Sequence, residues 1–65
     1  MKIRLNGKNL SITCSTLLDL IVHQNLDQKA VVAEYNYKVV KQDDWEKVKI
    51  NNGDNIELLS FVGGG

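Results

Sequence analysis

Three glycines at the end of the sequence are the residues best suited to chemistry at a chain terminus. The chain finishes on "LLSFVGGG", with Gly63, Gly64 and Gly65 directly after an apolar, strand-like run. Because glycine loses more conformational freedom on ordering than any other residue, such an end does not help to hold a fold together. A cloning scar would normally add polar tag residues, so we interpret residues 63–65 as a flexible functional tail rather than a frayed end.

Two other residues carry reactive side chains, and each is the only one of its type: Cys14 and His23. We interpret Cys14 as a small filler residue rather than a reactive thiol, because it lies far along the chain from the glycines. His23 falls in the last turn of a predicted helix and is expected at the surface. One histidine and one distant cysteine supply no metal cluster, and a base without a positioned nucleophile supplies no enzyme.

Composition narrows the class of protein further. With 65 residues the chain forms one domain with a thin core. Eight basic and eight acidic residues give zero net charge without long runs of either sign, which argues against nucleic acid or a membrane surface as partner. No apolar run approaches the roughly 18 residues of a spanning helix, and the start lacks the apolar core of a signal peptide. A single cysteine forms no internal disulfide. These features predict a cytosolic protein that is stabilised by packing alone.

The first elements that must position the tail are a hairpin and a helix. Apolar residues alternate with polar ones on both sides of Asn6-Gly7, a pair that suits a tight primed turn, so two antiparallel strands are expected. "STLLDLIVHQN" follows, with Thr16 and Asp19 at the spacing of a capping box. The apolar residues that recur at the spacing of one helical face are Leu17, Leu18, Ile21 and Val22. This helix is expected to cover the sheet.

The second half of the chain predicts three more strands. "AVVAEYN" is β-branched and ends at a turn around Asn36, "KVV" is a short return strand, and "NIELLSFV" is the last strand after the "NNGD" turn. "KQDDWEKV" is expected to be a turn of helix or a loop. Within it we interpret Trp45 as closing the edge of a small core rather than anchoring a partner. The charges of "KQDD" and Asp54 are interpreted as solvated rather than as contacts to a basic partner.

This order of elements predicts an α+β domain: a small twisted sheet with one helix across one face. In the last strand Ile56 and Leu58 share one face, while Leu59 and Phe61 belong to the other. If Ile56 and Leu58 point toward the helix, Leu59 and Phe61 are left in solvent immediately before the glycines. Leu59 and Phe61 are therefore candidate partner-docking residues.

The order of elements together with "LNGK", "YNYKVVKQDDW", "NNGD" and the ending Gly64-Gly65 resembles the ubiquitin-like β-grasp fold, and more closely the ThiS family. The resemblance covers the whole chain. It implies a mixed sheet of four to five strands with one helix packed across one face and the last strand in the centre. On this basis we expect a β-grasp domain over residues 1–62 and a flexible glycine tail over residues 63–65.

Members of the ThiS family are sulfur carriers of thiamin biosynthesis, so the resemblance implies a carrier that binds no cofactor itself. An ATP-dependent, ubiquitin-activating-like adenylyltransferase would adenylate the carboxylate of Gly65. Sulfur from a cysteine desulfurase persulfide would then displace AMP and leave a thiocarboxylate for thiazole synthase. Gly63 and Gly64 would thread into the partner, because residues without Cβ let the backbone pass closely through a narrow channel.

Three alternatives share part of this pattern. The small subunit of molybdopterin synthase has similar tail chemistry and a different sulfur acceptor, although those chains tend to be longer. A ubiquitin-like modifier would end in an isopeptide bond to another protein. A plain interaction domain would bind a partner through Leu59 and Phe61, and its glycines would have no role.

Overall fold

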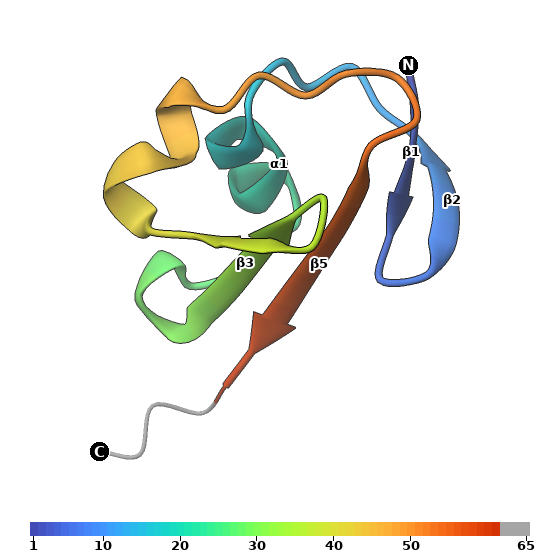
Figure 1. The fold of residues 1–65 in the computed structure, drawn as a ribbon. Coiled ribbons are helices and arrows are strands. Elements are labelled where there is room, and N and C mark those ends of the chain that lie inside the picture. The colour runs from blue at the N-terminus through green and yellow to red at the C-terminus, as the bar shows by residue number, and fades with distance from the viewer. Residues whose placement is uncertain (62–65) are drawn as a thin grey trace.

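The computed structural model describes residues 1–61 and confirms the expected β-grasp architecture: five strands form one mixed sheet with one α-helix (Figure 1). In chain order the elements are β1 (Lys2–Leu5), β2 (Lys8–Ser11), α1 (Leu17–His23), the 3₁₀ helix η1 (Gln28–Ala30), β3 (Val31–Tyr35), β4 (Lys38–Val40), the 3₁₀ helix η2 (Gln42–Lys47) and β5 (Asn55–Ser60). Among residues 1–61 no helix is long and apolar enough to cross a membrane.

The sheet order is β2-β1-β5-β3-β4, so the last strand is the central one, as the family resemblance implied. β1 and β5 run parallel, with Leu5 beside Ile56, while β5 and β3 run antiparallel, with Leu58 beside Ala33. Both neighbours of β5 precede it in the sequence, so β5 fills the position between β1 and β3 and completes the sheet. In the sequence, Phe61 and Val62 separate the end of β5 from the three glycines.

Both hairpins are made by turns with left-handed backbone. Asn6 and Gly7 have φ of 51° and 80°, as the primed turn between β1 and β2 requires. In the turn between β3 and β4, Asn36 and Tyr37 have φ of 49° and 72°. Asparagine tolerates this region and was expected there, whereas tyrosine is less usual. The two turns set the registers of β1 with β2 and of β3 with β4.

Helix α1 begins with the predicted capping box. The backbone N–H of Asp19 donates to the Thr16 hydroxyl at 3.1 Å, and the backbone N–H of Thr16 donates to the Asp19 carboxylate at 3.3 Å. The Ser15 hydroxyl also donates to Asp19, at 2.9 Å, and this bond contributes most to holding the pKa of Asp19 below its ordinary value. These bonds matter because a helix of seven residues has little stability of its own.

The predicted apolar face of the helix was partly wrong. Leu17, Leu20 and Ile21 are fully buried, whereas Val22, expected to face the sheet, is 53% exposed. Each residue turns the helix by about 100°, so Leu20 lies about 60° from Leu17, but Val22 lies about 140° from it. The buried stripe is therefore centred on Leu17, with Leu18 at its margin.

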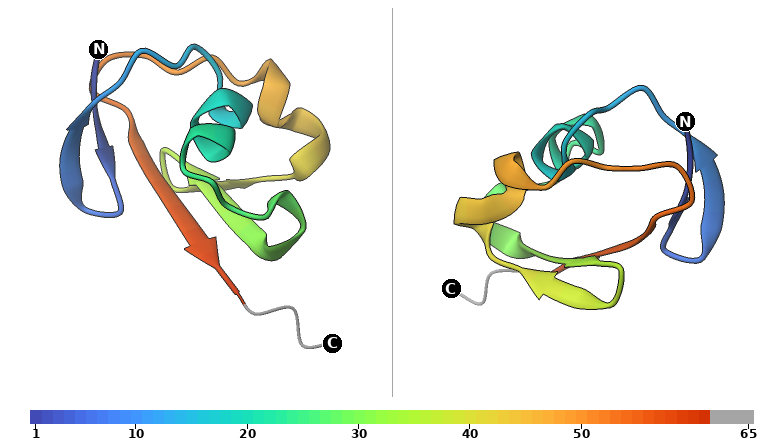
Figure 2. Two further views of the ribbon diagram at one scale, coloured as in Figure 1. Left: turned by 180° about the vertical axis from the view of Figure 1, so that it is seen from behind. Right: turned by 45° about the horizontal axis from the view of Figure 1, so that its top comes forward.

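Helix α1 packs across one face of the sheet (Figure 2). One hydrophobic core lies between them, and its buried residues come from β1, α1, β3, η2, β5 and the segments that join them. The buried apolar residues are Ile3, Ile12, Cys14, Leu17, Leu20, Ile21, Val31, Ala33, Trp45, Ile50, Ile56 and Leu58. Trp45 is only 2% exposed and its indole N–H donates to the carbonyl of Val40 at 2.9 Å, which confirms its interpretation as a core residue.

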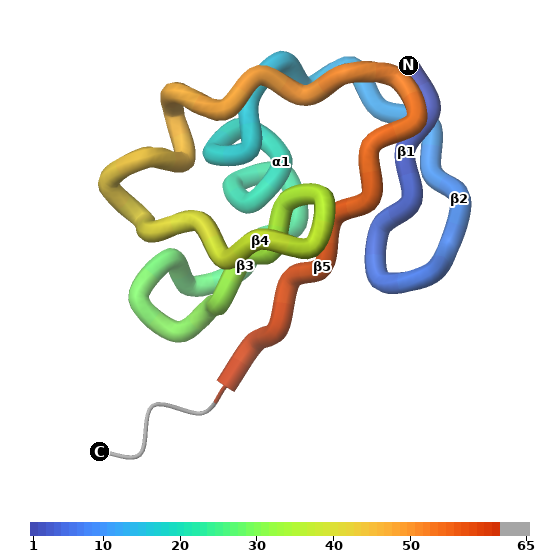
Figure 3. The backbone as a smooth tube through the Cα atoms, viewed as in Figure 1, coloured from blue at the N-terminus to red at the C-terminus, as the bar shows by residue number. Residues whose placement is uncertain are grey.

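The segment between η2 and β5 runs beside the segment between β2 and α1 (Figure 3). Backbone bonds join Leu17 N–H to the carbonyl of Val48 and Ile50 N–H to the carbonyl of Ser15, both at 3.0 Å. Further along, Gly53 N–H donates to the carbonyl of Lys2 at 2.7 Å. This crossing brings the chain from the helix side of the molecule to the start of β5.

Candidate functional site: the uncovered face of the sheet

The central strand β5 divides its side chains between the core and solvent, as its alternation predicted. Ile56 is 0% and Leu58 5% exposed beneath the helix, whereas Leu59 is 57% exposed on the opposite face. Phe61, which directly follows the strand, is 50% exposed. The prediction that Leu59 and Phe61 lie in solvent is confirmed. Their role in docking stays a prediction.

β3 and β4 extend this exposed face with apolar residues that the sequence reasoning missed. Val32 on β3 lies directly opposite Leu59, and Val39 on β4 lies directly opposite Glu34. Both valines are exposed. The alternation of Val32 with the buried Val31 and Ala33 in "AVVAEYN" could have indicated that Val32 is exposed. Its position opposite Leu59, however, depends on the pairing of two strands that are distant in the sequence. We call the patch of Val32, Val39, Leu59 and Phe61 the docking face.

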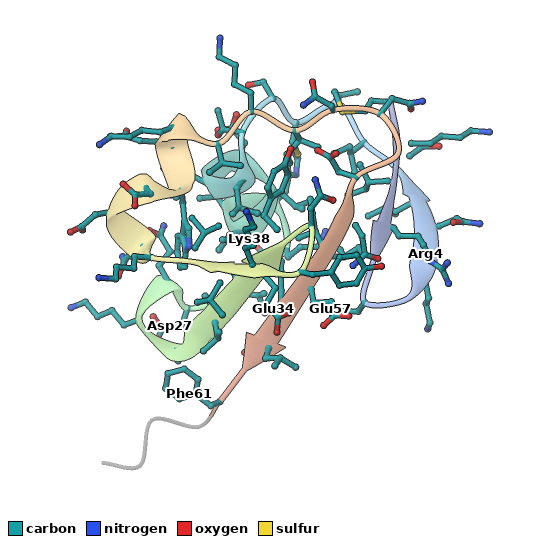
Figure 4. All side chains as sticks on the ribbon, viewed as in Figure 1. Arg4, Asp27, Glu34, Lys38, Glu57 and Phe61 are labelled. Carbon is teal, nitrogen blue, oxygen red and sulfur yellow. The ribbon has the colours of Figure 1, made fainter. Side chains whose placement is uncertain are left out.

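Hydrogen bonds on both sides hold the end of β5 in place. Phe61 N–H donates to the carbonyl of Ala30 at 2.8 Å, so pairing with β3 continues one residue beyond the strand's end. On the other side β1 has already ended, and the Asn6 side chain takes its place. Its Oδ1 accepts from Leu58 N–H at 2.8 Å, and its Nδ2 donates to the Leu58 carbonyl at 3.2 Å. The described chain therefore reaches Phe61 in a defined direction (Figure 4).

The predicted last strand over "NIELLSFV" is two residues longer than β5, which ends at Ser60. Val62 and the predicted tail residues Gly63, Gly64 and Gly65 lie outside the described residues. The division into a domain of residues 1–62 and a tail of residues 63–65 thus stays a prediction. Within the described part of the chain, however, every core residue lies between Ile3 and Leu58.

Cys14 is buried beneath the helix, as its interpretation as a filler residue predicted. Burial, with a smaller effect from the charge of Asp19, raises the pKa of its thiol above the ordinary value. Cys14 and the exposed His23 line one surface hollow of about 240 Å³ beside β2. A raised pKa keeps the thiol protonated and therefore a poor nucleophile. Among residues 1–61, no group of three or more His, Cys, Asp or Glu side chains is placed to hold a metal ion.

The interpretation of Asp54 as a solvated charge was wrong. Its carboxylate accepts hydrogen bonds from the Tyr35 hydroxyl, from the backbone N–H of Asn51 at 2.7 Å and from Asn36 Nδ2 at 3.2 Å. Burial alone would raise the pKa of Asp54, but these hydrogen bonds together lower it below its ordinary value. Burial and the same carboxylate raise the pKa of Tyr35. Asp54 therefore has a structural role.

Comparisons with known proteins agree with this architecture. Residues 3–65 match the model of the ThiS family. The sulfur carrier protein ThiS of Bacillus subtilis (strain 168) is 32% identical over 65 residues, which cover 97% of this chain and 98% of that protein. The crystal structure of the thiamine biosynthesis protein ThiS from Geobacter metallireducens superimposes with a TM-score of 0.83 at 26% identity and covers all of both chains.

A third relative is much longer. A thiazole synthase of Paramagnetospirillum magneticum (strain ATCC 700264 / AMB-1) is 29% identical over 66 residues, which cover 100% of this chain but only 20% of that protein. This chain therefore spans about a fifth of the length of that relative.

Sheet order, helix position and the exposed end of the central strand define a ubiquitin-like β-grasp protein. Within that class the chain belongs to the ThiS family, the small sulfur carriers of thiamin biosynthesis, which are not catalysts.

Proposed function

We propose that this chain carries sulfur as a thiocarboxylate on Gly65. The proposal rests most on the match to the ThiS family, which continues to residue 65. It is supported by the placement of β5, whose end projects from the centre of the sheet beside an exposed apolar face. A carboxylate is a poor acyl donor, so it needs a better leaving group before sulfur can be attached.

In the proposed sequence the Gly65 carboxylate attacks the α-phosphorus of ATP on an adenylyltransferase partner, and pyrophosphate leaves. The terminal sulfur of a persulfide, supplied by a cysteine desulfurase, then attacks the acyl-adenylate and AMP leaves. A second thiol reduces the resulting acyl disulfide and releases the thiocarboxylate. Gly63 and Gly64 pass through the partner's channel, where the absence of Cβ allows close approach of the backbone.

The docking face, and Leu59 and Phe61 in particular, is proposed to bind the adenylyltransferase. Exposed apolar patches that lie beside a reacting group commonly mark protein interfaces. Thiazole synthase is the proposed sulfur acceptor. A thiazole synthase that contains a segment similar to this whole chain supports this pairing, because fused segments place carrier and acceptor in one molecule.

Deletion of Gly65 tests the carrier proposal. Incubated with the adenylyltransferase of the same genome, ATP and a persulfide donor, the full chain should exchange one oxygen for one sulfur in its intact mass. The truncated chain should not be loaded, because its carbonyl is displaced by about 3.5 Å and even 1 Å can cost about a hundredfold in rate. Its melting temperature should be unchanged, since every core residue among residues 1–61 lies before Ser60.

A full yield of thiocarboxylate from the truncated chain would refute the proposal. Covalent conjugates of the full chain to lysines of other proteins would instead indicate a ubiquitin-like modifier. Gly64→Ala serves as a graded variant: it should load more slowly than the full chain while its stability remains the same.

A further inference from the structure

Two glutamates lie directly opposite each other on the uncovered face of the sheet. Glu34 on β3 is the register partner of Glu57 on β5, and both are partly buried (Figure 4). Residues that face each other across an antiparallel pair have Cβ atoms about 5 Å apart, and like charges at such positions destabilise a sheet. The register therefore places two like charges at opposed positions near the centre of the uncovered face.

Among residues 1–61, neither Glu34 nor Glu57 forms an ion pair within 4.0 Å. Arg4 lies on the same face of the neighbouring strand β1, but its guanidinium donates to the carbonyl of Gly7 at 3.4 Å. Lys38 is paired with Tyr35, and by the alternation of strand residues it belongs to the other face from Glu34. Within residues 1–61 the one ion pair within 4.0 Å joins Lys47 to Asp44, on η2.

The glutamate pair adjoins the docking face. Val39 is beside Glu34 on β4, and the next outward-facing pair along β3 and β5 is Val32 with Leu59. A protein that covers the apolar residues therefore covers the two carboxylates as well. Enclosing them without a counter-charge would cost free energy, because buried charges require paired partners.

We propose that the adenylyltransferase that docks on this face inserts one Arg or Lys side chain between Glu34 and Glu57. This inference rests on the proposed function, since it names the chemistry by which the same partner is recognised. A guanidinium has five N–H donors and bridges two carboxylates well. The basic side chain removes the repulsion of the free carrier, and the removal of water strengthens its attraction to both carboxylates. The apolar contacts supply burial, whereas the charged contact selects the partner and its orientation.

Binding of the full chain to the adenylyltransferase of the same genome, measured by calorimetry without ATP, tests the inference. The variants are Glu34→Gln, Glu57→Gln and the double variant. The matched control is Glu46→Gln, an exposed glutamate on η2, which packs against α1 on the helix side of the sheet (Figure 2). Titrations at about 50 mM and about 500 mM NaCl separate the electrostatic contribution to binding from the apolar contribution, because salt screens electrostatic attraction.

The double variant should bind at least about tenfold more weakly at low salt, and the difference should shrink at high salt. Glu46→Gln should stay within about twofold of the unsubstituted chain. The melting temperature of each glutamine variant of the pair should rise, because the repulsion has been removed.

Equal binding by the double variant and the unsubstituted chain would overturn the inference, as would a loss that is independent of salt. Failure of the unsubstituted chain to bind at all would instead refute the proposed docking. If the unsubstituted chain binds and is loaded while the double variant behaves identically, only the basic contact is refuted and the carrier function stands.

Discussion

At the scale of single residues, the one thiol in the sequence is enclosed in the hydrophobic core. Cys14 belongs to the core beneath α1, and burial raises the pKa of its thiol. Phe61, the last described residue before the proposed reacting end, follows the central strand on the uncovered side of the sheet. These observations support our proposal that a carboxylate, rather than the thiol, bears the sulfur.

Cys14→Ala should leave sulfur loading unchanged, because the thiol takes no part in it. The free energy of unfolding should fall by about 1 kcal/mol, since a small buried side chain is truncated. Intact mass after loading and urea denaturation of the same sample measure the two quantities. Loss of thiocarboxylate from a folded Cys14→Ala chain would show that the thiol participates.

At the scale of elements, the alternating side chains of β5 contribute both to the core and to the docking face. Its inner face, with Ile56 and Leu58, completes the core, and its outer face presents Leu59. The strand keeps this orientation because β3 pairs with it on one side and β1, extended by the Asn6 side chain, on the other. Truncation of an outward residue of β5 is thus expected to weaken partner binding. Truncation of an inward residue is expected to lower the stability of the fold.

Leu59→Ala should weaken binding to the adenylyltransferase by about 2 kcal/mol, or about thirtyfold in Kd, as is common for an apolar anchor. Its stability should change by no more than about 0.5 kcal/mol, because the side chain is exposed. Leu58→Ala should instead lower stability by about 3 kcal/mol.

Val22→Ala is the matched control, since Val22 on α1 is 53% exposed, close to the 57% of Leu59. It should alter neither binding nor stability appreciably. Unfolding of the Leu59→Ala chain, or equal weakening by Val22→Ala, would contradict the assignment of the docking face.

At the scale of the whole molecule, Asp54 joins segments that are distant in the sequence. Its carboxylate binds Tyr35 and Asn36 of the hairpin formed by β3 and β4, and also the backbone of Asn51 before β5. The side chain of Asn36 in turn accepts from Asn55 N–H at 2.9 Å. These bonds fix the point at which the chain enters the central strand.

Asp54→Ala should lower the free energy of unfolding by about 2 kcal/mol near pH 7, because charge-assisted hydrogen bonds are lost. The folded pKa of Asp54 is lower than the ordinary value of 3.8. Its contribution is therefore fully present above that value and is lost as pH falls through the lower folded pKa. Urea denaturation at a series of pH values, from neutral to below 3.8, measures the free energy of unfolding of both chains. The difference in this free energy between the two chains should shrink on acidification. A difference that stays constant, or one matched by the control Asp43→Ala, would argue against the carboxylate's role.

Features that depend on neighbouring residues could be predicted from the sequence. The Asn6-Gly7 turn, the Thr16–Asp19 capping box and the two faces of β5 follow from local backbone preference and period-two alternation. The buried face of α1 was harder to predict, because five apolar residues on a short helix allow more than one choice of buried face. Only packing against the sheet selected Leu20 over Val22.

By itself the sequence determined the kind of fold, through the order of its elements along the whole chain. It also determined the exposure of Leu59 and Phe61 and the glycines on which the carrier proposal rests, because these follow from residue type and spacing along one segment. The tertiary structure alone decided which distant residues meet. The pairing of Glu34 with Glu57 depends on the register of β3 with β5. The hydrogen bonds of Asp54 depend on bringing the hairpin turn against the segment before β5. Such contacts arise when elements distant in the chain pack together. β4 and η2 separate β3 from β5, so no tight turn sets the register of this pair.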